Sequence, residues 1–212
     1  MSDRSIYVAG LELRDRLRAN LQAFEAVAAN AEGLRRAAVA VTVVAGDRDE
    51  AMFLITERSS GLRDHAGQFA LPGGRIDPGE TPELTALREL EEEVGLALGP
   101  DAVLGRLDDF TTRSGFVMSP VVVWGGRPGR LERNPGEVEA IHAFPLGILE
   151  GPDVPHLERI PQSDRPVLSI PLGNGDSIWA PAGAILYQLR EAGLHGRATR
   201  VAHFEQPLFA WR

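Results

Sequence analysis

The segment 74–96, GRIDPGETPELTALRELEEEVGL, constrains the chain more than any other stretch. Thr81 is a good N-cap, and Pro82 suits the first helical position, where a missing N–H costs nothing. Gly95 can adopt the left-handed conformation that ends a helix. The segment therefore predicts a short helix that begins after Thr81, ends at Gly95 and carries a dense group of glutamates.

One face of the expected helix is apolar and another is acidic. The apolar positions recur at spacings of three, three and four residues and are Leu84, Leu87, Leu90 and Val94. Such a stripe packs on a hydrophobic core. Glu89, Glu92 and Glu93, at positions i, i+3 and i+4, share a face roughly opposite the stripe.

The acidic face is unfavourable for the helix itself. Glu89 and Glu93 are like charges one turn apart, which destabilises a helix by about a few tenths of a kcal/mol. Both lie away from the N-terminal end, where the helix dipole would favour them. Arg88 reaches Glu92 at i+4 and offsets only part of the charge. A solvated surface is the ordinary interpretation of an acidic face, so a binding site needs further support.

The positions that precede the helix give that support. The helix follows Leu71-Pro72-Gly73-Gly74, a tight turn whose backbone can approach the helix closely. A carbonyl of this turn, assigned to Gly73, and two or three carboxylates form an all-oxygen cluster of the kind that Mg²⁺ or Mn²⁺ prefers. The predicted metal ligands are therefore Gly73, Glu89, Glu92 and Glu93.

The whole run resembles the Nudix box of the Nudix hydrolase family. Gly74 is followed after five residues by Glu80, and after seven more by Arg88-Glu89-Leu90-Glu91-Glu92-Glu93-Val94-Gly95-Leu96, so every constrained position is filled in register. The resemblance implies an α/β fold, the Nudix α/β/α sandwich with a mixed β-sheet. It also implies hydrolysis of a diphosphate link with Mg²⁺ or Mn²⁺ as the cofactor.

Hydrophobic patterning predicts strands on both sides of the box helix and further helices towards the ends of the chain. An amphipathic helix is expected over residues 10–29, with Leu13, Leu17, Leu21 and Phe24 on one side. The expected strands are 37–45 and 52–56, which form a hairpin, then 103–111, 116–124 and 138–144, and a second hairpin of 168–171 and 177–179. Pro181 opens a helix through Arg190, with Gly193 as the candidate stop. This order suggests a mixed sheet covered on both faces.

These elements suggest three parts of the chain. A helical extension is expected over residues 1–36 and a Nudix hydrolase domain over 37–194. The tail, residues 195–212, is apolar enough to dock on the domain or on a partner subunit. The oligomeric state stays open and includes a homodimer.

Composition limits the partners and the compartment. The net charge of −8 argues against nucleic acid and would repel a phosphate ester unless a divalent metal bridges the two. No apolar run approaches the ~20 residues that span a bilayer, and the N-terminal sequence lacks a secretory apolar region. The chain has no cysteine, which excludes disulfides and fits a reducing compartment. We therefore expect a cytoplasmic protein that acts on a small molecule, with no nucleic-acid or membrane partner.

The sequence before the box resembles one branch of the family, the coenzyme A pyrophosphatases. Residues 54–74 read LITERSSGLRDHAGQFALPGG, and the likeness extends over residues 37 to about 150. It implies that Arg58, Arg63, His65 and Gln68 contact substrate phosphates, a task to which arginine is well suited. The alternative is that the arginines are surface charges and His65 is bonded locally. The chain departs from the branch at 179–183 and beyond His195.

The resemblance implies a mechanism in which Mg²⁺ ions on Glu89, Glu92 and Glu93 bridge the diphosphate oxygens and lower the pKa of bound water. Arg88 orients the carboxylates and keeps them ionised. The general base is either Glu89 or Glu137, which sits on a Pro-Gly turn just before a strand.

Coenzyme A or an acyl derivative would yield 3′,5′-ADP and a 4′-phosphopantetheine product. One alternative is hydrolysis of ADP-ribose or another nucleoside diphosphate derivative. A second alternative is a Nudix module that binds a nucleotide without cutting it, although such modules usually lack one of the metal carboxylates.

Overall fold

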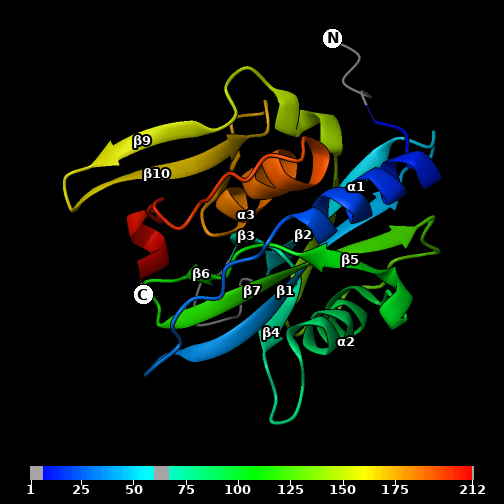
Figure 1. The fold of residues 1–212 in the computed structure, drawn as a ribbon, viewed down its shortest axis with the longest axis horizontal. Helices are drawn as coiled ribbons and strands as arrows, with labels where there is room; N and C mark the ends of the chain where they lie inside the picture. Colours follow the sequence, from blue (N-terminus) through cyan, green and yellow to red (C-terminus); the bar gives the residue numbers. More distant parts are fainter. Residues whose placement is uncertain (1–6, 60–66, 212) are drawn as a thin grey trace.

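The computed structural model describes residues 7–59 and 67–211 and is built around a central mixed sheet (Figure 1). The helices are α1 (Leu11–Ala23), α2 (Pro82–Val94) and α3 (Ala182–Gln188), with short helical turns η1 (Pro100–Ala102), η2 (Leu146–Glu150), η3 (Leu189–Leu194) and η4 (Leu208–Trp211). The strands are β1 (Arg35–Ala45), β2 (Ala51–Arg58), β3 (Phe69–Ala70), β4 (Gly73–Arg75), β5 (Val103–Arg106), β6 (Phe110–Thr111), β7 (Phe116–Gly126), β8 (Val138–Pro145), β9 (His156–Ile160), β10 (Ser163–Pro171) and β11 (Ser177–Trp179).

The central sheet is mixed, as predicted. Strand β1 runs parallel to β7 and antiparallel to β2, and the order along the sheet is β3-β2-β1-β7-β5. Strands β4, β6 and β8 pair with β1, β7 and β2, respectively. Strands β9, β10 and β11 form a second sheet of three strands. Both expected hairpins are present, β1–β2 and β10–β11.

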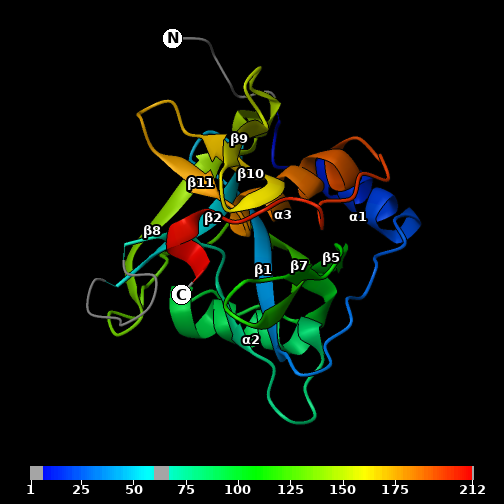
Figure 2. The same cartoon turned by 90° about the vertical axis from the view of Figure 1, so that its left-hand side faces the viewer.

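The two faces of the central sheet are covered by different elements. Along β1, Ala38, Ala40 and Val44 face α2 and pack with its Leu90 and Val94. The alternate residues, Val39, Val41 and Val43, face a larger cluster that includes α1 and α3. This period of two is the pattern of a strand buried on both faces. In Figure 2, α2 lies below the sheet, whereas α1, α3 and the second sheet lie above it.

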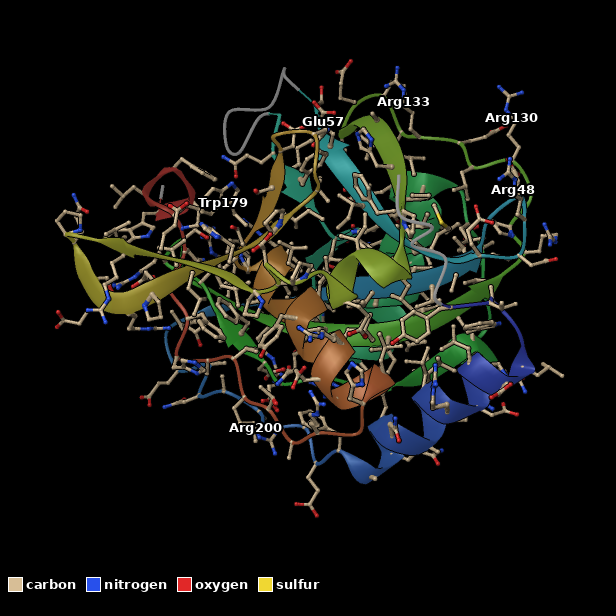
Figure 3. All side chains as sticks on the ribbon, turned by 90° about the horizontal axis from the view of Figure 1, so that it is seen from above. Arg48, Glu57, Arg130, Arg133, Trp179 and Arg200 are labelled. Atoms are coloured by element: carbon tan, nitrogen blue, oxygen red, sulfur yellow. The ribbon has the colours of Figure 1, made fainter. Side chains whose placement is uncertain are left out.

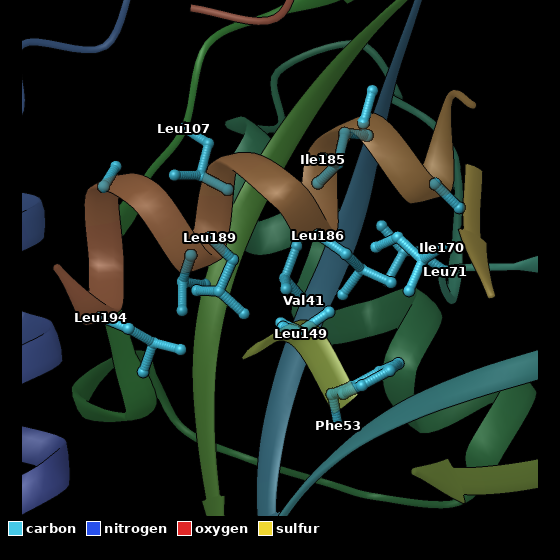
Figure 4. Close-up of a cluster of buried hydrophobic side chains, with 14 of the residues drawn as sticks. Val41, Phe53, Leu71, Leu107, Leu149, Ile170, Ile185, Leu186, Leu189 and Leu194 are labelled. Atoms are coloured by element: carbon cyan, nitrogen blue, oxygen red, sulfur yellow. The ribbon is translucent and has the colours of Figure 1, made fainter. Parts of the chain in front are cut away.

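The larger cluster ties both ends of the chain to the sheet. Figure 4 shows Leu186 and Leu189 packed over Val41 of β1, with Phe53 of β2 nearby. Helix α1 contributes its predicted residues, which are Leu13, Leu17, Leu21 and Phe24. Val201 and Phe204 of the tail are buried in the same cluster.

The division of the chain into an N-terminal extension, a Nudix domain and a tail stays a prediction.

Several element boundaries were wrong. The first helix ends at Ala23 rather than at residue 29, because the backbone N–H groups of Val27 and Ala29 donate to the carboxylates of Asp108 and Asp109 instead. Leu84 is 49% exposed and does not belong to the buried stripe of α2, where Ala86 packs instead. The range 103–111 is divided between β5 and β6, and β9 was not predicted.

The last helix differs from the prediction at its end. The chain stays helical to Leu194, because α3 continues into a π-helical turn. Gly193 does not stop it. A Cβ at Gly193 would lie 3.0 Å from a methyl group of Leu17, so this glycine permits the close approach of α1. Among the described residues no helix is long and apolar enough to cross a bilayer, and the cytoplasmic location stays a prediction.

The tail is fixed to the body of the protein by a buried glutamate. Glu205 forms an ion pair with Arg113 and accepts hydrogen bonds from the Ser163 hydroxyl and from the Gln206 backbone N–H. The Arg113 backbone N–H in turn donates to the Gln206 side chain at 2.8 Å. These hydrogen bonds, that from Arg113 above all, lower the pKa of Glu205 to about 2.

We expect Glu205→Gln to lower the free energy of unfolding at pH 7 by about 1–3 kcal/mol, because the variant leaves the Arg113 charge without its partner. The folded-state pKa is depressed, so this stabilisation is present above pH ~4.5 and is lost as the pH falls towards 2. When thermal unfolding is measured at a series of pH values from 7 to 3, the melting temperature of Glu205→Gln should therefore fall less than that of the wild type. The exposed control Glu32→Gln should follow the wild type; parallel curves for all three proteins would contradict the assignment.

Candidate active site

Helix α2 begins and ends where its sequence predicts. The Thr81 hydroxyl accepts the Leu84 backbone N–H, Pro82 occupies the first turn, and Gly95 closes the helix in the left-handed conformation with φ of 72°. These caps fix the register of the helix and so determine which side chains face inward.

Two of the three glutamates on the acidic face are buried rather than solvated. Glu89 is 8% exposed and Glu93 is 4% exposed, whereas Glu92 is exposed. Burial, together with the neighbouring charge of Glu89, raises the pKa of Glu93 to about 8. Burial also raises the pKa of Glu89, although Arg88 opposes this change. The solvated-surface interpretation therefore does not hold for Glu89 and Glu93.

The glycine turn approaches the helix as closely as the sequence suggested. A Cβ on Gly74 would overlap the Glu89 carboxylate, and a Cβ on Gly73 would overlap the carbonyl of Ala38 on β1. A Gly73 backbone N–H also bonds to Glu93 and lowers its pKa somewhat. Glycine is thus required at both positions because the turn is packed between β1 and the buried carboxylates.

Arg88 links the helix to the loop that precedes it. Its Nε and Nη2 donate to the two oxygens of Glu80 at 3.0 and 3.1 Å, and its Nη1 donates to Glu89 at 2.8 Å and to Glu92 at 3.1 Å. Nη2 also donates to the Arg75 carbonyl. The bond from Arg88 lowers the pKa of Glu80 to about 2. The predicted contact with Glu92 is confirmed, and Glu80 is an additional partner.

A cavity of about 850 Å³ lies against this part of the helix. Its wall includes most of the predicted site residues, which are Arg58, Gln68, Gly73, Glu89, Glu93 and Glu137. Arg88 and Glu92 are not part of the wall. Arg63 and His65 lie outside the described residues.

A NUDIX domain sequence model matches residues 34–168, which is more than half of the chain. The chain belongs to the Nudix hydrolase family. It is 40% identical to Nudix hydrolase NudL of Yersinia enterocolitica over 115 residues, and the match covers 54% of this chain and 57% of that protein. It is also 40% identical to NudL of Yersinia pestis, in a match that covers 53% of this chain and 56% of that protein. The matched part therefore spans little more than half of these relatives.

The structure also resembles a solved Nudix fold. A MutT/nudix family protein from Enterococcus faecalis superposes with a TM-score of 0.52 at 18% identity, over 74% of this chain and 61% of that one. At this identity the likeness concerns the fold alone, and it agrees with the predicted Nudix α/β architecture.

The Nudix site has a donor set that suits a hard cation. The charge of Glu137 raises the pKa of both Glu89 and Glu93, the charge of Glu89 also raises that of Glu93, and all the potential ligands are oxygens. Within the part of the chain that the structure describes, no three acidic or histidine side chains converge tightly enough to form a finished metal cage. The residues fit a divalent cation by the chemistry of their oxygen atoms.

Several residues of the cavity wall could not be found from sequence spacing. Arg35 and Arg75 both lie near the ring of Phe116, with the Arg35 guanidinium 3.9 Å from the ring centroid. Trp179 and Phe209 line the cavity from the second sheet and the tail. Arg35 meets Phe116 only because β1 and β7 are paired in register, and no local motif marks that pairing.

We expect Arg88→Lys to lower the hydrolase activity characteristic of this family by about ten- to a hundredfold, although it keeps the charge. A lysine ammonium cannot reproduce the planar fork that joins Glu80, Glu89 and Glu92, and small displacements of catalytic groups are costly. Steady-state rates at saturating metal provide the measurement. Arg127→Lys, which alters an exposed pair with Asp49 outside the cavity wall, is the matched control. Near wild-type rates in Arg88→Lys would show that only the charge matters.

Proposed function

We propose that this Nudix protein hydrolyses the diphosphate link of a nucleoside diphosphate derivative in a reaction that depends on Mg²⁺ or Mn²⁺. The observation that carries the proposal is the buried pair Glu89 and Glu93, which faces a cavity large enough for a nucleotide. Burial of two neighbouring carboxylates disfavours their ionised forms, which raises the pKa of both. A reaction that depends on a cation would explain why Glu89 and Glu93 are both buried here.

The Gly73 carbonyl, Glu89 and Glu93 would hold the cation. Glu92 would join them only after release from Arg88, to which it is now bonded. When bound, a divalent cation neutralises the diphosphate and lowers the pKa of a bound water. Arg88, which does not line the cavity, contributes by donating a hydrogen bond that orients the Glu89 carboxylate.

Glu137 is the better placed of the two candidate bases. Glu89 is already engaged by Arg88 at 2.8 Å, whereas Glu137 is exposed on the cavity wall. The carboxylate of Glu137 would accept the proton of the attacking water, and the water oxygen would form the new bond to phosphorus while the bridging P–O bond breaks.

Glu137→Gln should lower kcat by about 10²–10⁴-fold, the usual contribution of a positioned base, without loss of metal affinity. Glu139→Gln is the control, because this nearby exposed carboxylate does not line the cavity. A loss smaller than about tenfold in Glu137→Gln would remove it as the base and favour Glu89.

Coenzyme A or an acyl-coenzyme A is the proposed substrate, on the resemblance of residues 54–74 to the coenzyme A branch. Arg58 supports this assignment, because it lines the cavity and its buried Nε has no hydrogen-bond partner among the described residues. Its charge also acts on Glu93 and lowers the pKa of that group. These observations support a contact between Arg58 and a substrate phosphate near Glu93.

The test of the function is a panel of coenzyme A, ADP-ribose, NADH, dinucleoside polyphosphates and dNTPs, each with Mg²⁺, Mn²⁺ or chelator, followed by product identification. We expect metal-dependent release of 3′,5′-ADP from coenzyme A. Faster turnover of ADP-ribose would favour the alternative substrate class. Nucleotide binding without turnover of any compound would show a binding module instead.

Arg58→Ala should raise KM for coenzyme A by about ten- to a hundredfold and change KM for dephospho-coenzyme A much less. The reason is that a charge-assisted hydrogen bond to the 3′-phosphate is absent from the second substrate. Arg63→Ala is the parallel variant. Arg130→Ala is the control, since Figure 3 shows Arg130 directed outward and well separated from Trp179 of the cavity wall. Equal effects of Arg58→Ala on both substrates would rule out a contact with the 3′-phosphate.

A further inference from the structure

The tail forms part of the cavity wall although it lies beyond the likeness to the coenzyme A branch. Gln206, Phe209 and Ala210 line the cavity together with Trp179 of β11. In Figure 3, Trp179 lies beside the C-terminal helical turn, which is drawn in red. Part of the cavity wall is therefore supplied by the second sheet and the tail.

Two aromatic rings meet at this wall. The ring centroids of Trp179 and Phe209 are 6.2 Å apart and the rings are perpendicular, an edge-to-face arrangement, and both residues line the cavity. Phe209 is 49% exposed despite its apolar side chain. Phe209 thus presents apolar surface to the cavity that a ligand would remove from water.

The position of Phe209 is fixed from both sides. Before it, the Arg113–Glu205 ion pair and the bond from the Arg113 backbone to Gln206 attach the tail to the β6–β7 turn. After it, the Trp211 indole N–H donates to the Gln206 carbonyl at 2.9 Å, and the Arg113 guanidinium lies 4.5 Å from the Trp211 ring centroid. Because the flanking residues are held in this way, the backbone at Phe209 would lose little conformational entropy when a ligand stacks on its ring.

We propose that Trp179 and Phe209 form the subsite for the nucleobase of the substrate, and that the tail thereby favours ligands that carry a base. This inference rests on the proposed function, because a nucleoside diphosphate derivative combines a flat ring with a diphosphate. Glu89 and Glu93 would bind the diphosphate through the cation. The Trp179–Phe209 pair supplies the aromatic surface on which bases stack without strict selection among them. An apolar acyl chain would not require flat surfaces.

The experiment measures binding of 5′-AMP and of ribose 5-phosphate to the full chain without metal, by calorimetry and by quenching of tryptophan fluorescence. Ribose 5-phosphate has the sugar and phosphate of 5′-AMP with a hydroxyl in place of the base, and neither ligand contains a diphosphate link. We expect 5′-AMP to bind roughly five- to a hundredfold more tightly, which is the usual contribution of base stacking on an aromatic side chain.

Phe209→Ala should abolish most of this preference, and Phe209→Tyr should retain it. Leu208→Ala is the matched control, because Leu208 is the preceding exposed residue of the tail and does not line the cavity. Unchanged preference in Phe209→Ala, or equal binding of both ligands to the wild type, would overturn the inference. Neither result depends on turnover. Conversely, a preference lost in Phe209→Ala would support the subsite even if the substrate panel showed no hydrolysis.

Discussion

The hydrogen bonds of Arg88 hold the site together. One guanidinium joins Glu80 of the loop to Glu89 and Glu92 of helix α2 and also bonds to the Arg75 carbonyl next to the glycine turn. The loop therefore cannot move away from the helix without breaking several charge-assisted bonds. This contact keeps the turn so near to α2 that the Glu89 carboxylate tolerates no side chain at Gly74.

The glycine turn lies against two buried carboxylates of α2. Glu89 and Glu93 are buried on the same side of α2, and burial raises the pKa of both. Other buried acids of the protein have a structural partner, as Glu205 has Arg113. For Glu93 no described cation lies within ion-pair distance. The proposed function supplies a partner for it, a divalent cation that would bind with the substrate or before it.

Local sequence patterns predicted the local features of the site. The caps Thr81 and Gly95, the contact between Arg88 and Glu92, and the hairpin of β1 and β2 all follow from rules that involve neighbouring residues. The prediction that Leu84 belongs to the buried stripe of α2 was wrong, because spacing along a helix does not show which turns of the helix lie against the sheet.

Features that join distant segments could not be predicted from the sequence. The carboxylates of Asp108 and Asp109 redirect the chain after α1, and the ion pair of Glu205 with Arg113 helps to hold the tail at the cavity wall. Such contacts depend on the assembled fold, and no spacing in the sequence marks them.

The most direct test of this account is the binding of Mn²⁺, followed by electron paramagnetic resonance, in the wild type and in Glu89→Gln and Glu93→Gln. Glu91→Gln, an exposed position on the same helix, is the control. The account predicts that the first two variants bind Mn²⁺ weaker by at least about tenfold and that Glu91→Gln binds as the wild type does. Wild-type affinity in both Glu89→Gln and Glu93→Gln, combined with lower melting temperatures without metal, would show that the buried carboxylates are structural and would contradict it.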